Sequence, residues 1–184
     1  MRDQSWSVFA LPLALVMSAC GTESVDPIGS RPDFSAYASA SAIVERPLTG
    51  NCQTVYEFVD FEFLPPPQED VPARGTIHHT GTCLLAHLGA TALTKDEVID
   101  FTVLPAHVEG QLTLTAANGD QLSGRESSDV QPPDDSGVFE AVGRWTFAGG
   151  TGRFEDASGT ALFTAAGSVN DNTTTRVLNG RLSY

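Results

Sequence analysis

From residue 50 to the C-terminus, apolar and polar residues alternate with the two-residue period of β-strands. Residues 52–64 combine β-branched and aromatic side chains in near alternation, and Pro65-Pro66-Pro67 ends this run because proline donates no hydrogen bond to a strand ladder. Further strand-like segments are 75–80, 81–91, 98–104, 111–116, 121–126, 137–148, 160–169 and 174–184. No segment after residue 20 keeps a helical period over about ten residues, so the pattern predicts an all-β domain.

Glycine and asparagine mark the turns between these segments. Asn118-Gly119 lies between two alternating segments and predicts a tight hairpin, since both residue types tolerate positive φ. Gly149–Gly152 predicts a second tight turn, and residues 153–157 a single helical turn. A phosphate-binding loop is the alternative for these glycines, but such loops open a long helix, whereas a strand follows here. About seven to nine short strands with such turns indicate a β-sandwich or a closed barrel, and closure removes exposed strand edges.

The first twenty residues have a different pattern. Arg2 precedes an uncharged run at 6–19, which is shorter than the roughly 20 apolar residues of a membrane-spanning helix but matches a secretory signal. The run ends in Val16-Met17-Ser18-Ala19-Cys20 and resembles a bacterial lipobox. The resemblance implies a lipoprotein signal peptide at 1–19. Cys20 would then be the mature N-terminus, carrying acyl chains such as palmitate that anchor an exported protein in the cell envelope.

The residues around this cysteine bear on its processing and destination. Gly21, rather than aspartate, follows Cys20, which resembles lipoproteins of the outer rather than the inner membrane. The alternative is an ordinary signal peptide cleaved near Ser18, with Cys20 incidental, and Asp3 weakens the basic start of either leader. Residues 20–48 are rich in Ser, Ala, Gly and Pro without a sustained period. They predict a lipidated, disordered tether ahead of a barrel domain at 49–184.

Composition narrows the range of partners. The 184-residue chain has 23 acidic and 10 basic residues, a formal net charge of -13. Such a surface repels phosphate backbones and anionic lipid headgroups, which disfavours nucleic acid as a partner and leaves the lipid anchor as the membrane contact. No recognised cofactor or metal motif is present in the sequence, so we expect neither. We expect a monomer or a small homo-oligomer.

Cys52 and Cys83 form an even pair beyond the leader. An exported protein meets oxidising conditions, and the two cysteines lie near the starts of neighbouring strand segments, which favours a disulfide. Two buried free thiols are one alternative. A Cys/His metal site that adds His87 is another, although the spacing matches no recognised site.

The C-terminal half also carries a family resemblance. In segment 143–163 a strand runs into Gly149-Gly150-Thr151-Gly152-Arg153-Phe154, followed by a helical turn and another strand. The hairpin at 114–120 and the segment 86–89 fit the same pattern, which is similar to that of bacterial exported proteins of the allene oxide cyclase and dirigent barrel superfamily. The resemblance covers about residues 50–184 and implies a calycin-like antiparallel barrel of eight strands.

The resemblance also implies candidate functions. Plant members of that superfamily bind a hydrophobic or phenolic ligand in the lumen and direct a cyclisation or a radical coupling. A barrel of about eight strands can hold one small ligand or be filled with side chains. Three hypotheses follow: an envelope lipoprotein whose barrel binds a small apolar ligand or a protein partner, a cyclase- or dirigent-like enzyme, and a structural domain with a filled core.

An enzyme would need polar groups in the lumen. No catalytic residue of the plant enzymes is carried over, because the resemblance defines no register for them, and the best candidates are Glu57, which interrupts an apolar strand face, and His87. The alternatives are a solvated Glu57 and a hydrogen-bonded structural His87. Small residues expected to leave space in the lumen are Gly89, Ala141 and Gly143, and aromatic residues expected to fill it are Phe61, Phe63, Trp145 and Phe147.

Overall fold

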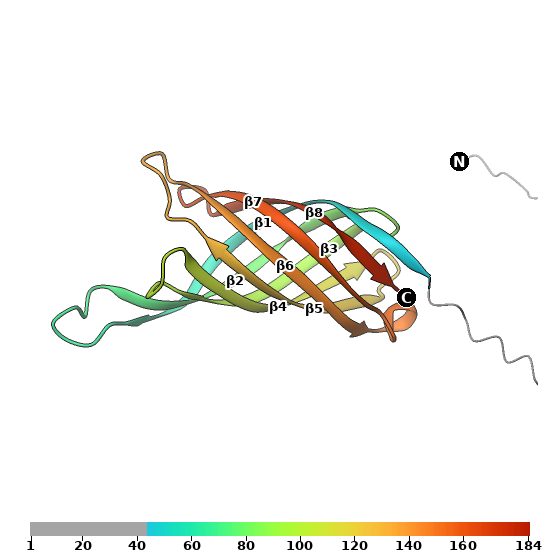
Figure 1. The fold of residues 1–184 in the computed structure, drawn as a ribbon, viewed down its shortest axis with the longest axis horizontal. Helices are drawn as coiled ribbons and strands as arrows, with labels where there is room; N and C mark the ends of the chain where they lie inside the picture. Colours follow the sequence, from blue (N-terminus) through green and yellow to red (C-terminus); the bar gives the residue numbers. More distant parts are fainter. Residues whose placement is uncertain (1–43) are drawn as a thin grey trace, which may run out of the picture. The chain divides into compact units, whose positions relative to one another are not determined.

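The computed structural model describes residues 44–184, which form a closed barrel of eight antiparallel strands (Figure 1). The strands are β1 (Glu45–Phe63), β2 (Pro72–Leu85), β3 (Gly89–Asp100), β4 (Ala106–Ala116), β5 (Gln121–Val130), β6 (Val138–Gly150), β7 (Ser158–Ser168) and β8 (Thr173–Ser183). Each strand pairs with its neighbours in sequence, and β8 closes the barrel against β1. The predicted all-β antiparallel barrel of eight strands is confirmed.

Alternation along each strand decides which side chains fill the barrel. In β3 the buried positions are Thr91, Leu93, Lys95, Glu97 and Ile99, and the residues between them face outward. This is the two-residue period that the sequence shows, because successive side chains of a strand point to opposite faces.

β1 begins at Glu45, inside the segment that the sequence predicts as a tether. Its first residues pair only with β8, and pairing with β2 starts at Gly50. Pro47 therefore lies where one side of the strand has no partner, so its missing N–H removes no hydrogen bond on that side. Leu48, one residue further, is completely buried in the barrel.

Gly81 does not divide two strands, so the predicted break between residues 80 and 81 is wrong. Gly81 lies within β2, opposite Thr54 of β1. A Cβ atom at this position would come 2.1 Å from the backbone oxygen of Gln53, so the glycine allows close approach of two strands. The chain turns instead at residues 86–88, where His87 and Gly89 have φ of 64° and 74°.

The other predicted turns are present. Gly119 has φ 91° and its N–H donates to the carbonyl oxygen of Ala116 in the β4–β5 hairpin. After β6 the chain forms a short 3-10 turn, η2 (Gly152–Phe154), whose Phe154 is completely buried. The helical turn expected just after Gly152 is thus confirmed in kind and lies slightly earlier.

The interior has two halves. β1 starts and β8 finishes at the same end of the barrel, and the long β1–β2 hairpin projects from the other end (Figure 1). The half near the chain ends, here called the closed half, holds a continuous apolar core that includes Leu48, Trp145, Phe147 and Phe154. The Cys52–Cys83 disulfide, predicted from the sequence, lies in this core and joins β1 to β2.

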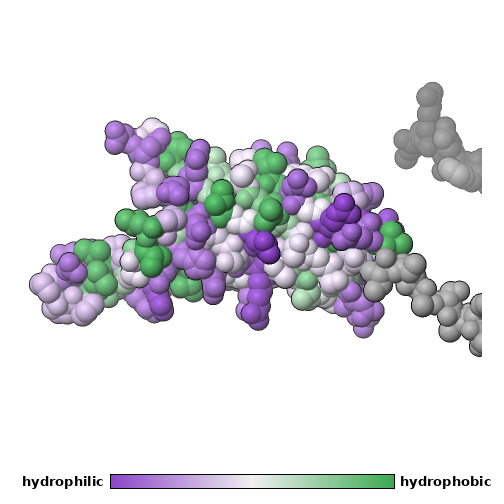
Figure 2. Space-filling view, in the orientation of Figure 1, coloured by the Kyte–Doolittle hydropathy of each residue, from purple (hydrophilic) through white to green (hydrophobic). Residues whose placement is uncertain are grey.

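The opposite half, here called the open half, has a smaller cluster of Tyr56, Ile77, Ile99, Ala106 and Val108. Trp145 and Phe147 fill the barrel as expected, but Phe61 and Phe63 do not. They lie on the projecting hairpin, 37% and 54% exposed, because the strand pair continues past the barrel wall there. Figure 2 shows hydrophobic residues among polar ones on this hairpin.

The predicted signal peptide and the lipidated Cys20 lie outside the described residues. Within residues 44–184, the structure contains no helix with the length and apolar character needed to cross a membrane.

Candidate functional site

A cavity of about 240 Å³ occupies the open half of the barrel. All eight strands contribute to its wall, which is mostly apolar, and it reaches the loops that follow β3, β5 and β7. The apolar wall residues include Tyr56, Ile77, Ile99, Val108, Phe139, Ala141, Phe163 and Ala165. Leu104, Pro132, Pro133 and Val169 line its mouth, at the end opposite the start of β1.

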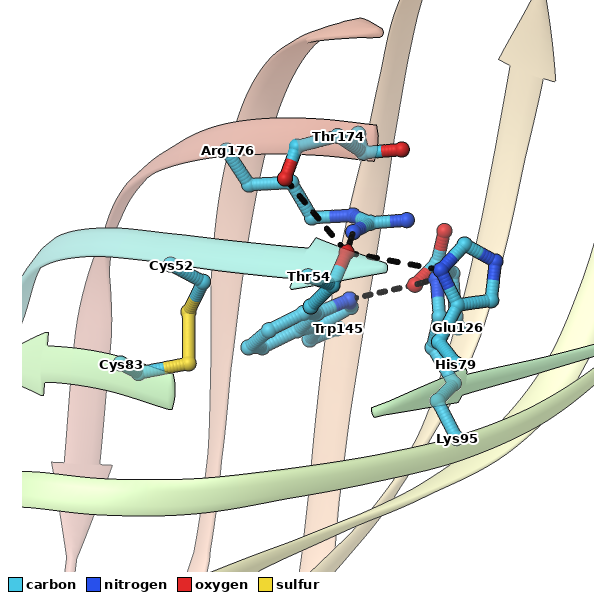
Figure 3. The surroundings of a disulfide bond; sticks show 9 residues. All are labelled: Cys52, Thr54, His79, Cys83, Lys95, Glu126, Trp145, Thr174 and Arg176. Carbon is cyan, nitrogen blue, oxygen red and sulfur yellow. Dashed lines mark hydrogen bonds and ion pairs between the residues drawn. A yellow bond between two sulfur atoms is a disulfide. The ribbon is translucent and has the colours of Figure 1, made fainter. Parts of the chain in front are cut away.

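Polar side chains form the floor of this cavity, at the boundary with the closed half. They come from inward-facing positions of β2, β3, β5 and β8 and are almost completely buried. The floor residues that line the cavity are His79, Glu97, Glu126, Ser128, Thr174 and Arg176. Figure 3 shows several of them near the disulfide, together with Lys95 and Trp145.

Lys95 holds the two carboxylates of the floor. Its Nζ lies 2.6 Å from Oε2 of Glu126 and forms a second ion pair with Glu97. Glu126 also accepts hydrogen bonds from Trp145 Nε1 at 2.7 Å and from Ser128 Oγ at 3.0 Å. Burial lowers the pKa of Lys95 and nearby Arg176 lowers it further, while the two glutamates oppose the shift. Both carboxylate oxygens of Glu126 thus have donors from the protein: Lys95 and Trp145 donate to Oε2, and Ser128 donates to Oε1.

His79 extends this network toward β1. Its Nε2 lies 2.7 Å from Oε2 of Glu97, and its Nδ1 lies 3.5 Å from Oγ1 of Thr54. Burial lowers the pKa of His79 to about 2, with smaller contributions from Lys95 and Arg176. A neutral imidazole with its proton on Nε2 fits both contacts, because it donates to Glu97 and accepts from the threonine hydroxyl.

Arg176 is less completely paired. Its Nη1 donates to Thr54 Oγ1 at 3.0 Å, and its guanidinium lies 5.9 Å from the ring centroid of Phe163. Among residues 44–184, Nε of Arg176 has no hydrogen-bond partner and no carboxylate forms an ion pair with the guanidinium. The hydroxyl of Thr174, on the same face of β8, likewise has no hydrogen-bond partner in the described structure.

The charges of the floor balance. In formal charges, the two cationic side chains Lys95 and Arg176 are matched by the two carboxylates Glu97 and Glu126, and the neutral His79 adds none. Burial of an isolated charge is costly, so opposite charges gathered in one layer are the arrangement that a barrel interior tolerates. The floor is thus a fixed polar layer of zero formal charge beneath an apolar cavity.

Glu57 and His87 do not line the cavity. Glu57 is exposed opposite His78 on the outer face, because Tyr56 beside it points inward and alternation turns the next side chain out. His87 lies exposed in the β2–β3 turn at the closed end. Of the residues expected to leave space, Ala141 lines the cavity, whereas Gly89 lies at the closed end.

The floor residues carry a signal in the sequence that the alternation reveals. Lys95 and Glu97 fall on the same face of their strand as Leu93 and Ile99, so charged side chains interrupt an apolar face. Arg176 interrupts the face that Leu178 and Leu182 share in β8. A buried charge in such a position needs partners on other strands, and the sequence alone does not show which strands meet across the barrel.

Comparison with known proteins adds no assignment, because no family model, no curated protein and no solved structure matches this chain. In the part of the chain that the structure describes, no group of three or more His, Cys, Asp or Glu side chains is arranged to hold a metal ion.

Proposed function

We propose that this chain is an exported, lipid-anchored envelope protein whose barrel binds a small apolar ligand in its open half. The observation that carries the proposal is the apolar cavity of about 240 Å³ with its polar floor. A ligand that fills the cavity removes apolar surface from water, both its own and that of the wall, and each Å² removed stabilises the complex by about 25 cal/mol.

The form of the cavity suits binding. Its wall comes from strands held in a closed hydrogen-bonded barrel, and its floor is fixed by the Lys95 ion pairs. Small-molecule sites are commonly preformed, largely apolar and equipped with a few convergent polar groups, at volumes from about 300 Å³ upward. The volume here lies just below that range, which favours a small ligand.

Two further observations support the export and anchoring parts of the proposal. The Cys52–Cys83 disulfide suits an oxidising compartment. The chain enters the barrel through Glu45 at the closed end, opposite the cavity mouth. The barrel is therefore joined to the preceding residues at the end away from the cavity mouth.

Native mass spectrometry of the full chain, produced in a bacterial host and extracted in mild detergent, tests ligand binding. We expect a reproducible bound molecule that organic extraction recovers and that partitions as an apolar compound. Repeated observation of only the lipid-modified protein mass, from several hosts and after incubation with an apolar metabolite extract, would contradict the proposal.

A second candidate function is a cyclase- or dirigent-like enzyme that works in the lumen. The observation that favours it is the presence of Glu97, Glu126 and Arg176 at the end of an apolar cavity, where charged groups act strongly on a bound molecule. Incubation of the recovered ligand, or of its biosynthetic precursors, with the protein separates the two functions. A binding protein returns the molecule unchanged, whereas an enzyme converts it.

A further inference from the structure

Two side-chain groups of the cavity floor, both on β8, can donate hydrogen bonds and have no partner in the described structure. Nε of Arg176 and the hydroxyl of Thr174 have no partner in the described structure, although the two residues are 4% and 3% exposed and line the cavity. Buried polar groups are nearly always hydrogen-bonded, so the unpartnered guanidinium N–H points to an acceptor that a ligand supplies, and the neighbouring Thr174 hydroxyl can donate to the same atom.

The carboxylate oxygens of the floor already face cations or donors, and Oε1 of Glu97, which has no hydrogen bond, is contacted by the ammonium group of Lys95. Glu126 accepts from Lys95, Trp145 and Ser128. Glu97 interacts with Lys95 and with Nε2 of His79. A ligand that brought a hydrogen-bond donor to the floor would compete with these contacts, whereas a ligand that brings an acceptor finds unused N–H and O–H groups.

The charge balance of the floor selects among acceptors. Its two cations, Lys95 and Arg176, are matched by Glu97 and Glu126, so the layer has no formal charge to neutralise. A ligand carboxylate would leave the buried layer with a net negative charge, next to two existing carboxylates. A neutral oxygen leaves the balance intact and avoids the cost of burying an uncompensated charge.

We propose that the ligand is a neutral apolar molecule with a carbonyl oxygen, such as a ketone or an ester, bound with that oxygen at Arg176 and Thr174. Its apolar part lies along Tyr56, Ile99 and Phe139 toward the mouth. A cavity of about 240 Å³ corresponds to roughly eight water volumes of about 30 Å³, so the buried part has on the order of ten non-hydrogen atoms. This inference rests on the proposed ligand-binding function.

Three probes of similar size test the inference on the full-length wild-type protein: butylbenzene, 4-phenyl-2-butanone and 3-phenylpropanoate. At pH 7 we expect the ketone to bind about tenfold more tightly than the hydrocarbon, the gain of one well-placed hydrogen bond, and more tightly than the carboxylate. Equal affinity of ketone and hydrocarbon, or tightest binding of the carboxylate, overturns the carbonyl inference and leaves the proposed function standing. Absence of binding for all three overturns both.

Substitutions in β8 locate the oxygen. Thr174→Val removes the hydroxyl without changing the side-chain shape, and we expect about a fivefold loss of ketone affinity with hydrocarbon affinity unchanged. Thr175→Val, on the exposed face of the same strand, is the matched control and leaves both affinities unchanged. Arg176→Met should reduce the ketone to the level of the hydrocarbon. If this variant does not fold, Thr174→Val and the three-probe series still decide, and an unchanged ketone preference in Thr174→Val places the oxygen elsewhere.

Discussion

At the scale of single residues, the buried charges of the cavity floor determine both stability and site geometry. Glu126 accepts from three donors, Lys95, Ser128 and Trp145. Replacement of the carboxylate by a neutral group weakens or removes all three contacts. Removal of one partner from a buried ion pair commonly costs about 3–5 kcal/mol. We expect Glu126→Gln to lower the free energy of unfolding by about this amount, measured by urea denaturation.

The exposed Glu109 provides the control for that measurement, because Glu109→Gln removes a charge at a surface position and should change stability by less than about 0.5 kcal/mol. If Glu126→Gln proves as mild as Glu109→Gln, the floor is not the rigid ion-paired layer described above.

His79 makes stability depend on pH. The folded protein holds the pKa of His79 at about 2, whereas the ordinary value of 6.5 applies after unfolding, so the unfolded chain binds a proton that the folded chain does not. Stability from this residue is therefore complete above pH 6.5 and declines as pH falls toward 2. Between pH 6.5 and 4.5 we expect the free energy of unfolding to fall by about 2–3 kcal/mol, which urea denaturation at each pH would measure.

The substitution His79→Gln should flatten that pH profile. His107 is the control, because its hydrogen bond to Asp129 raises the pKa of His107. Its contribution to stability therefore has the opposite pH dependence and is lost as pH rises. His107→Gln should therefore keep the decline between pH 6.5 and 4.5. A profile that declines equally in wild-type and His79→Gln protein would show that other groups cause it.

The sequence predicts residues of this layer only in part. Alternation places Lys95 and Glu97 on an apolar strand face, but Glu126, the partner of Lys95, lies 31 positions away along the chain, and His79, the partner of Glu97, lies on another strand. Glu57 interrupts a face that is apolar in composition yet points outward, so side-chain character alone gives the wrong face there. Only the register across β1, β2 and β3 distinguishes the two cases.

At the scale of elements, the strands were predictable where turns carry a strong local signal. The Asn118-Gly119 hairpin lies where the sequence predicts it, since positive φ is required at Gly119, whereas the turn predicted at Gly149–Gly152 starts two residues late because β6 continues to Gly150. Gly81 and Pro47 mislead, because their usual role as strand breakers is overridden by a close strand approach and by an unpaired strand side. Both reasons depend on neighbouring strands and are absent from the local sequence.

The β1–β2 pair also carries the disulfide, which closes a loop with a sequence separation of 31. A cross-link of this span stabilises by about 3–4 kcal/mol, chiefly by restricting the unfolded chain. We expect the double variant Cys52→Ala, Cys83→Ala to lose about that much in urea denaturation, with the cavity in the other half of the barrel still present. Wild-type protein measured under reducing conditions should match the double variant, and a double variant as stable as oxidised wild type would contradict the prediction.

At the scale of the whole molecule, the barrel separates a filled half from a half that contains a cavity. β1 begins at the filled half, so the residue at which the proposed anchor segment joins the barrel lies opposite the proposed binding cavity. We expect mass analysis of the mature N-terminus to show a lipid-modified Cys20, and Cys20→Ala to move the protein from the membrane to the soluble fraction. An unmodified N-terminus near Ala19 would instead support an ordinary signal peptide.

A matched pair of substitutions on β6 tests whether the proposed ligand binds in the cavity. Ala141 faces the cavity, and its neighbour Val142 is 58% exposed on the outer face. Ala141→Phe places a ring in the cavity, whereas Val142→Phe adds the same ring outside. The comparison is made on proteins whose urea denaturation shows that both variants fold.

The most direct measurement is calorimetric titration of butylbenzene, an apolar molecule of about the size of the cavity, into the wild-type protein and these two variants. We expect saturable binding to the wild type and to Val142→Phe, and at least about a tenfold loss of affinity in a folded Ala141→Phe variant. Equal binding by all three proteins, or no saturable binding by the wild type, would contradict the claim that this cavity takes up an apolar ligand.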